Sequence, residues 1–324
     1  MAIAAKPADP AHCVHRVRPP SRAPGAAGSV EPATADRRAV TRMLWLPVVL
    51  LASAAAALVW GALRWHTATQ ALLARLEATR EPIQPARHDA RELDALPPPV
   101  RRYFRAVLQD GAPMVAGATL AHRGRLNLSA DPATPRWKPF TSRQQIVVRR
   151  PGFVWDARVA LLPGLAVHVH DAYVDAQGIL HPSIAGLVTL ADLQGTEELA
   201  RGELMRFFAE AAWYPTALLP NQGVRWEPLD EHAARATLQD GPRSLTLTFR
   251  FGADDLIASV RAEARGRTVG ERVVPTPWEG RWFDYRRCDG MLVPMAGEVA
   301  WLLPEGAMPY WRGTVTALRY DLAP

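Results

Sequence analysis

The sequence predicts an α+β protein with one transmembrane helix near the N-terminus, followed by a mainly antiparallel sheet with packed helices. Three observations support this. An uncharged apolar run of 20 residues begins at Leu44 and ends at Leu63. From about residue 117, apolar side chains recur at every second position, which is typical of half-buried strands. One segment within that region, residues 197–212, instead repeats with a helical period. A helix inserted among sequential antiparallel strands defines the α+β class.

The apolar run has the length of a bilayer's hydrocarbon core, since a helix of 20 residues rises about 30 Å. Trp45 lies near one end of the run, and Trp60 and Trp65 lie near the other, where interfacial aromatic belts are found. We therefore predict a membrane helix over residues 43–65. A cleaved signal peptide is one alternative, although its small-residue pattern at 52–54 would lie inside the run. A buried helix of a soluble domain is the other, although such helices are seldom apolar on every face.

Residues 1–42 form a predicted disordered basic tail, because they are rich in Pro, Ala and Arg. They hold seven basic and three acidic residues, which is most of the net charge of +6. The remainder is nearly neutral and gives no electrostatic footprint for nucleic acid. The positive-inside rule places the tail in the cytoplasm and the domain outside, anchored in the inner membrane. A start at Met43 would reverse this charge argument. Cys13 and Cys288 would face opposite sides, so no disulfide is expected.

Residues 66–92 are predicted to form a stalk or linker, and residues 93–324 a single soluble domain. The helix can continue from His66 to Arg80 before Pro82 stops it. A second helix should follow the prolines at 97–99. Its buried face would carry residues spaced by three and four positions, namely Val100, Tyr103, Phe104, Val107 and Leu108.

The sheet is best seen in residues 244–251, where Leu and Phe alternate with Thr and Arg. Asp240-Gly241 and Asp289-Gly290 predict tight turns, as do the clusters at 175–178 and 252–255. The inserted helix at 197–212 has Thr196 as its expected cap. Its period places Leu204 and Phe208 on the buried face and Glu210 outside it.

Several segments resemble a bacterial family of single-span membrane proteins with an uncharacterised extracytoplasmic domain. They are LPPPVRRY at 96–103, PGFVWDA at 151–157, DAYVD at 171–175, RGEL at 201–204, WYPTALLP at 213–220, PTPWEG at 275–280 and PYWRG at 309–313. The resemblance runs from about residue 93 to the end. It implies membrane anchorage and the extent of the domain, and it carries no activity. The pattern of strands, with MLVP at 291–294 after a late turn, also resembles the curved half-barrel of outer-membrane lipoprotein carriers.

Tryptophan is the residue type that points to a binding site, since eight of the 11 lie in this domain. Indole rings provide large apolar area and one N–H donor, which suits the wall of a pocket for an apolar ligand. A core built from large residues explains the same composition. Trp278 and Trp282 lie in a proline-bounded segment with the composition of a loop. The candidate ligand-binding residues are Trp155, Trp213, Trp278, Trp282, Trp301, Tyr310, Trp311, Arg158 and Glu203.

Metal binding and catalysis have weaker support. His168 and His170 would share one face of a strand near Asp171, with His181 ten residues on, but no second cluster adds ligands. A structural role is favoured, and neither a metal nor a cofactor is predicted. Paired carboxylates could serve a hydrolase, and the candidates are Asp156, Asp171, Glu203, Glu279 and Asp284. Asp156 is expected to pair with Arg158 or Glu203. Nucleophile, phosphate and dinucleotide motifs are not found in the sequence.

The sequence therefore favours a membrane-anchored extracytoplasmic domain that binds a hydrophobic or lipid-like ligand without turnover. Its expected partners are the membrane, through residues 44–63, and a lipid or apolar small molecule. A structural or assembly protein that binds a protein partner is the alternative, and a carboxylate hydrolase is a further one. A sheet filled solidly by its own side chains would rule out ligand carriage.

Overall fold

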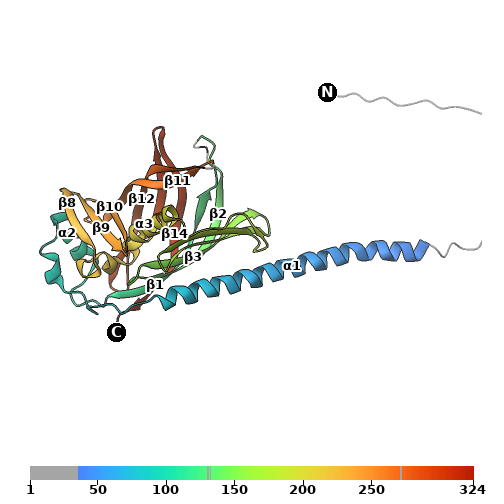
Figure 1. Ribbon diagram of the computed structural model, residues 1–324, viewed down its shortest axis with the longest axis horizontal. Coiled ribbons are helices and arrows are strands. Elements are labelled where there is room, and N and C mark those ends of the chain that lie inside the picture. The colour runs from blue at the N-terminus through green and yellow to red at the C-terminus, as the bar shows by residue number, and fades with distance from the viewer. Residues whose placement is uncertain (1–35, 130, 132, 271) are drawn as a thin grey trace, which may run out of the picture. The chain divides into compact units, whose positions relative to one another are not determined.

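The computed structural model describes residues 36–129, 131, 133–270 and 272–324 (Figure 1). The predicted basic tail lies outside these residues up to position 35. The helices are α1 Asp36–Ala78, α2 Pro98–Val107 and α3 Glu197–Ala209, with short 3-10 turns η1 Ala90–Leu93, η2 Glu210–Trp213, η3 Pro215–Leu218 and η4 Pro220–Gln222. The strands are β1 Val115–Asn127, β2 Trp137–Val147, β3 Gly152–Leu162, β4 Leu165–Val174, β5 Gln177–Ile184, β6 Val188–Thr189, β7 Leu193–Gln194, β8 Arg225–Asp230, β9 Ala233–Asp240, β10 Arg243–Phe251, β11 Ile257–Val269, β12 Arg272–Cys288, β13 Met291–Leu303 and β14 Gly306–Leu322.

The strands of the described chain form one 14-stranded sheet, and every named pair is antiparallel. The order is β6-β5-β4-β3-β2-β1-β14-β13-β12-β11-β10-β9-β8, with β7 beside β5. Apart from the pairing of β1 with β14, sequence neighbours pair along this path, as short turns predict. The predicted α+β class with an antiparallel sheet is confirmed.

The sheet curls around α3, which lies against one of its faces (Figure 1). Helix α3 contacts β3, β4 and β5 on one side and β10 and β11 on the other. The two sides also meet directly, because the Tyr173 hydroxyl donates to Asp240 at 2.6 Å and Arg243 donates to the Ala176 carbonyl at 2.8 Å. Seven strands separate β4 from β10 in the sheet order. Only a strongly curved sheet brings them together, so the half-barrel shape is confirmed.

Local sequence signals place most elements correctly. Strand β10 buries its Leu and Phe positions and exposes the alternate ones. Asp289 and Gly290 both have positive φ, 47° and 84°, as a two-residue hairpin turn requires. Thr196 caps α3 by accepting the Leu199 amide at 3.3 Å. Helix α2 buries Val100, Tyr103, Phe104 and Val107 in the main core, as predicted.

The segment with Trp278 and Trp282 is a correction, since it forms strand β12 rather than a loop. The strand accommodates Pro275 and Pro277 because they lie outside the part of β12 that pairs with a strand on each side. Pairing with β13 begins only at Trp278, and Pro277 lies where the register with β11 shifts. A proline is tolerated at such edge positions. Both tryptophans are buried rather than exposed.

Helix α1 contains the one stretch of the described chain, Pro47–Ala78, that is long and apolar enough to cross a membrane. Residues 52–324 form one compact unit. Within that unit the predicted extension past His66 is confirmed as far as Ala78. Leu76 packs against Val147, Val154, Ala172, Val174 and Ile179 on the outer face of the sheet. The predicted stalk is thus packed on the domain.

Trp65 fastens the helix to the same outer face. Its ring stacks on His170 at 3.8 Å, and its Nε1 donates to Asp156 Oδ1 at 2.9 Å. Thr69, one turn further on, lies 2.7 Å from the Nε2 of His170. Trp65 is only 5% exposed, so it is a docking residue and not part of an aromatic belt. The pairing expected for Asp156 is corrected too, because its partner is Trp65.

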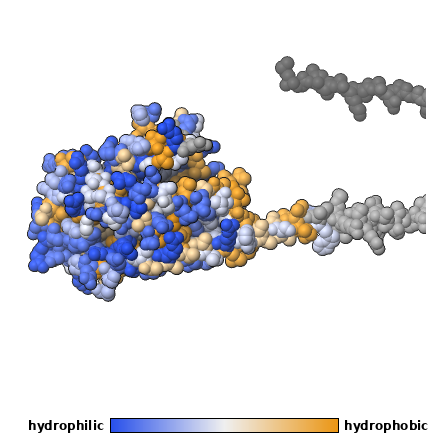
Figure 2. All heavy atoms as spheres, in the orientation of Figure 1, coloured by the Kyte–Doolittle hydropathy of each residue, from blue (hydrophilic) through white to orange (hydrophobic). Residues whose placement is uncertain are grey.

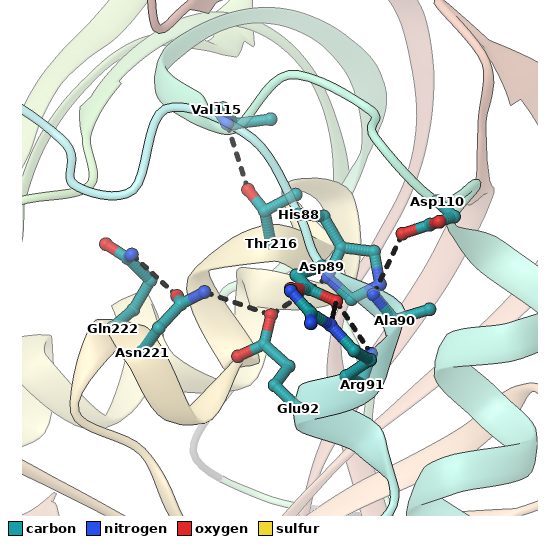
Figure 3. A network of polar contacts seen from close by, with 10 residues as sticks. All are labelled: His88, Asp89, Ala90, Arg91, Glu92, Asp110, Val115, Thr216, Asn221 and Gln222. Atoms are coloured by element: carbon teal, nitrogen blue, oxygen red, sulfur yellow. Dashed lines mark hydrogen bonds and ion pairs between the residues drawn. The ribbon is translucent and has the colours of Figure 1, made fainter.

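Residues 83–97, which connect α1 to α2, are also packed on the domain, and polar contacts hold part of this segment (Figure 3). Ile83 and Leu93 are buried in the main core. Glu92 Oε1 lies 2.9 Å from the Nδ1 of His88 and accepts from the Asn221 side chain at 3.0 Å. Thr216 accepts the backbone amide of Val115 at 3.0 Å. These contacts link the connecting segment and the start of β1 to the 3-10 turns after α3.

Candidate functional site

A cavity of about 530 Å³ lies between α3 and the concave face of the sheet. Its walls come from β1, β3, β4, β5, β11, β12, β13 and β14, and its floor from α3 and η2. The apolar side chains around it are Leu126, Leu128, Trp155, Val159, Val167, Val169, Leu180, Pro182, Leu190, Trp213, Trp278, Trp282, Val299, Trp301, Tyr310 and Trp311. This volume falls in the usual range for small-molecule sites.

The aromatic wall is organised by side-chain contacts that fix its rings. Trp301 stacks on Tyr310 at 5.6 Å, and the Tyr310 hydroxyl accepts from Trp278 Nε1 at 2.8 Å. Trp213 meets Trp282 edge to face at 5.0 Å and donates its Nε1 to the Pro294 carbonyl at 3.0 Å. Because these rings hold one another in place, the wall is preformed.

The floor of the cavity is polar and centres on Arg206. Its guanidinium donates to Asp171 at 2.6 Å, to Glu210 at 2.8 Å and to Gln144 at 3.1 Å. Gln144 in turn donates to the second oxygen of Glu210 at 2.7 Å. The same guanidinium lies 5.0 Å from the ring centre of Trp155, within the range of a cation–π contact.

A second arginine–carboxyl contact lies beside this ion pair. Arg265, on β11, approaches Glu203 at 3.5 Å and lies 5.2 Å from the ring centre of Trp278. Burial and the neighbouring Asp171 carboxylate raise the pKa of Glu203 well above its ordinary value, although Arg265 opposes this. Burial would lower the pKa of Arg206, but Glu210, Asp171 and Glu203 raise it. The floor therefore holds two arginines and three carboxyl groups, and the pKa of one of these carboxyl groups, Glu203, is raised.

Four buried polar atoms in the cavity lining have no hydrogen-bond partner within the described protein. They are the Nε1 atoms of Trp155 and Trp282, Asp171 Oδ1 and Glu203 Oε2. An unpaired buried polar group costs about 1–3 kcal/mol. Such groups in a cavity lining are available to a ligand, so the site offers two indole donors and a carboxyl pair.

Eight of the nine sequence-predicted site residues are brought together around this cavity. They are Trp155, Trp213, Trp278, Trp282, Trp301, Tyr310, Trp311 and Glu203. Arg158 is not among them, because it alternates with Trp155 along β3 and is exposed on the outer face. It pairs in register with His168 there. Glu203 has Arg265 as its partner rather than Asp156.

Sequence reasoning missed Arg206, Arg265, Gln144 and Glu210. The helical period placed Glu210 outside the buried face, but it is 9% exposed and bonded across the floor. Of the five carboxylates considered for catalysis, Asp171 and Glu203 meet at the floor. Glu279 and Asp284 instead pair with nearby Arg281 and Arg286.

The histidines considered for a metal site lie on the outer face around Trp65. His168 meets its ring edge to face at 5.2 Å, and His181 lies 5.9 Å away. Among the described residues no group of three His, Cys, Asp or Glu side chains is arranged to hold a metal ion. Burial, with His181 and His168 nearby, lowers the pKa of His170 to about 4. A neutral imidazole at His170 suits the stacking contact with the indole of Trp65.

Comparisons with known proteins identify the family of the chain. No curated protein matches the chain. A LolA superfamily protein from Nitrosomonas europaea is similar over 73% of this chain and 96% of its own, with 9% identity and a TM-score of 0.31. A beta-barrel-like protein of a domain of unknown function, DUF1849, from Brucella abortus covers 64% of this chain and 99% of its own, with 10% identity and a TM-score of 0.20. The model of a family of unknown function, DUF6920, matches residues 94–320, so the chain belongs to that family.

Proposed function

We propose that this protein is a membrane-anchored binding protein whose cavity holds an apolar, lipid-like ligand without turning it over. The observation that carries the proposal is the cavity of about 530 Å³ with its tryptophan wall. Ordinary cores are filled to crystal-like density and leave few voids larger than a water molecule. A void of this size, lined by preformed apolar rings, matches the general properties of a ligand site.

The polar floor defines which end of the ligand lies deepest. Leu126, Leu128 and Leu190 surround the outer part of the cavity, near the turns that end the strands, whereas Arg206 and Glu203 lie at α3. A ligand with an apolar chain and one polar end fits this gradient. Its polar end would take hydrogen bonds from the free indole N–H groups of Trp155 and Trp282.

The anchor supports the same function. The apolar run in α1 ties the domain to a bilayer, which is a source or a destination for apolar molecules. Because more Lys and Arg precede the run than follow it closely, we place the domain on the extracytoplasmic face of the inner membrane. The function then is to hold or present a lipid-like molecule at that surface.

Native mass spectrometry of the full-length chain, released from detergent in the instrument, tests ligand binding. We expect one additional mass for each protein molecule, which organic extraction should identify as a molecule with an alkyl or acyl chain. Val169→Trp, which places an indole inside the cavity, should abolish this mass. Leu229→Trp adds the same side chain at an exposed position on β8 and should retain it.

A clean protein mass for both the unchanged chain and Leu229→Trp would contradict the proposal. The alternative of an assembly protein that binds a protein partner would then lead. Retention of the ligand in Val169→Trp would show that the molecule binds elsewhere.

A carboxylate hydrolase is the second candidate, favoured by one observation. Asp171 and Glu203 both line the floor, and their proximity raises the pKa of Glu203, as in an acid and base pair. Hydrolysis of a p-nitrophenyl acyl ester that is lost in Glu203→Gln would support it. We favour binding, because Arg206 already engages Asp171 as an ion pair and Arg265 already lies 3.5 Å from Glu203.

A further inference from the structure

The strand ends nearest the membrane helix carry a group of exposed apolar side chains, which we call the apolar lip. It consists of Leu162, the last residue of β3, together with Val188, Leu190 and Leu193 after β5. These side chains are between 49% and 63% exposed. Residues 185–195 contain a single charged side chain, Asp192. Figure 2 shows hydrophobic residues gathered on this flank of the domain, beside the helix.

The lip is held against the end of the predicted membrane span. Gly61 lies two residues before the last apolar residue of the span, Leu63, which is a rise of about 3 Å. A Cβ atom at Gly61 would collide with the Ala185 carbonyl and the Leu187 side chain, and one at Gly186 would collide with the Gly61 backbone. Backbone therefore touches backbone at this point. The segment that carries Val188 and Leu190 therefore lies beside the C-terminal end of the apolar run.

The lip is also part of the cavity entrance. Leu190 belongs both to the lip and to the cavity lining, and the exposed Leu128 lines the same outer part. Val167 and Pro182, on the strands that lead to the lip, continue this apolar surface inward. An apolar path thus runs from the lip, beside the end of the apolar run, to the tryptophan wall.

We propose that the apolar lip inserts into the membrane leaflet in which α1 ends, so that the cavity opens directly onto the lipid bilayer. The inference rests on the anchoring part of the proposed function. Exposed patches of this kind mark interaction sites, and here the attachment to Gly61 identifies the bilayer as the occupant. A lipid-like ligand then passes between leaflet and cavity without crossing water.

Depth-dependent quenching tests the proposal on the full-length chain in vesicles of phosphatidylcholine and phosphatidylglycerol. Cys13 and Cys288 are replaced by Ser, and a single cysteine labelled with a nitrobenzoxadiazole dye is placed at Val188→Cys or Leu162→Cys. Val59→Cys, within the span, is the membrane control. Leu229→Cys is the matched aqueous control, because Leu229 is an exposed apolar residue on β8, the opposite edge strand.

We expect lipids spin-labelled near the head group to quench the dye at positions 188 and 162 and to leave position 229 unaffected. Quenching at position 59 but not at 188 or 162 would contradict insertion of the apolar lip and would still support a membrane span in α1. Absence of quenching at position 59 would contradict both the membrane span in α1 and the insertion of the apolar lip. Because the assay needs no bound ligand, quenching at the lip would support the inference even if mass spectrometry found the cavity empty.

Discussion

Arg206 is the cation on which the polar floor of the cavity depends. Its guanidinium donates to Asp171 and Glu210 at 2.6 and 2.8 Å, and its side chain is only 14% exposed. Removing one partner of a buried ion pair typically costs about 3–5 kcal/mol, because the other charge stays buried. We expect Arg206→Ala to lower the free energy of unfolding by about this amount, measured by guanidinium unfolding with tryptophan fluorescence.

The matched control is Arg286→Ala. Arg286 pairs with Asp284 at 2.9 Å, but both side chains are largely exposed. Exposed pairs contribute about 0–1 kcal/mol, so this variant should unfold almost as the unchanged chain does. Equal losses in the two variants would show that the floor is not the buried network described above.

Glu203 should make stability depend on pH in a direction opposite to most carboxylates. Its pKa in the folded chain is raised by burial and by Asp171, whereas in the unfolded chain it is near 4.5. Between these two pKa values the folded state binds one proton more than the unfolded state. The free energy of unfolding therefore falls as pH rises, by about 1.4 kcal/mol per pH unit within that interval.

Glu203→Gln removes the carboxyl group that binds this proton. The free energy of unfolding should therefore depend less on pH within that interval. The measurement is the difference in free energy of unfolding between the variant and the unchanged chain from about pH 5 to about pH 8. Other groups, including the histidines, cancel in the difference. A constant difference across this interval would mean that Glu203 ionises at its ordinary pKa in the folded chain.

At the scale of elements, helix α1 should undock when Trp65 is lost. Truncating a buried aromatic residue costs about 3–5 kcal/mol, and Trp65 also holds Asp156 and stacks on His170. We expect Trp65→Ala to raise the population of undocked helix, and trypsin cleavage after Arg75 and Arg80 to quicken by a factor of roughly ten or more.

Trp60→Ala is the control for this prediction. Trp60 lies five residues earlier on the same helix but is 58% exposed in the isolated protein. Its removal should leave the trypsin cleavage rate after Arg75 unchanged. If both variants were cleaved equally fast, the contact with the histidines would not be what holds the helix.

Elements were more predictable than contacts between them. Helix α3, its Thr196 cap and the alternation of β10 follow from residues close in sequence, and the structure confirms them. Trp65 could not be distinguished from an interfacial tryptophan, since its partner His170 lies 105 positions away in the chain. The two prolines of β12 suggested a loop because a sequence does not reveal where a strand lacks its second neighbour.

At the scale of the whole molecule, the curvature of the sheet creates the site. Local residue patterns do not predict how strongly a sheet curves. The tryptophans were predictable as a class, because their number and size indicate a wall or a core. The polar floor could not be predicted, because its hydrogen bonds join residues far apart in the sequence. Gln144 and Glu210 are 66 positions apart, and Arg206 and Asp171 are 35 positions apart. Arg158 could have been excluded, because strand alternation already separates it from Trp155.

The balance of charge across the whole cavity predicts which polar ends it accepts. Each of its two guanidinium groups already faces a carboxyl group, and a protonated Glu203 leaves the floor neutral. A free carboxylate would bring an uncompensated negative charge into a buried site. We expect an uncharged ester such as methyl palmitate to displace the apolar dye N-phenyl-1-naphthylamine at about tenfold lower concentration than palmitate.

Glu210→Gln should reverse this preference. It removes one negative charge beside Arg206 while keeping the shape of the side chain, so the floor gains a net positive charge. Palmitate should then compete more strongly, and methyl palmitate should be little affected. Glu279→Gln alters an ion pair outside the cavity lining, so the concentrations at which palmitate and methyl palmitate displace the dye should stay unchanged. If palmitate and its methyl ester competed equally in all three chains, the floor would not select the polar end, and ligand choice would depend on the tryptophan wall alone.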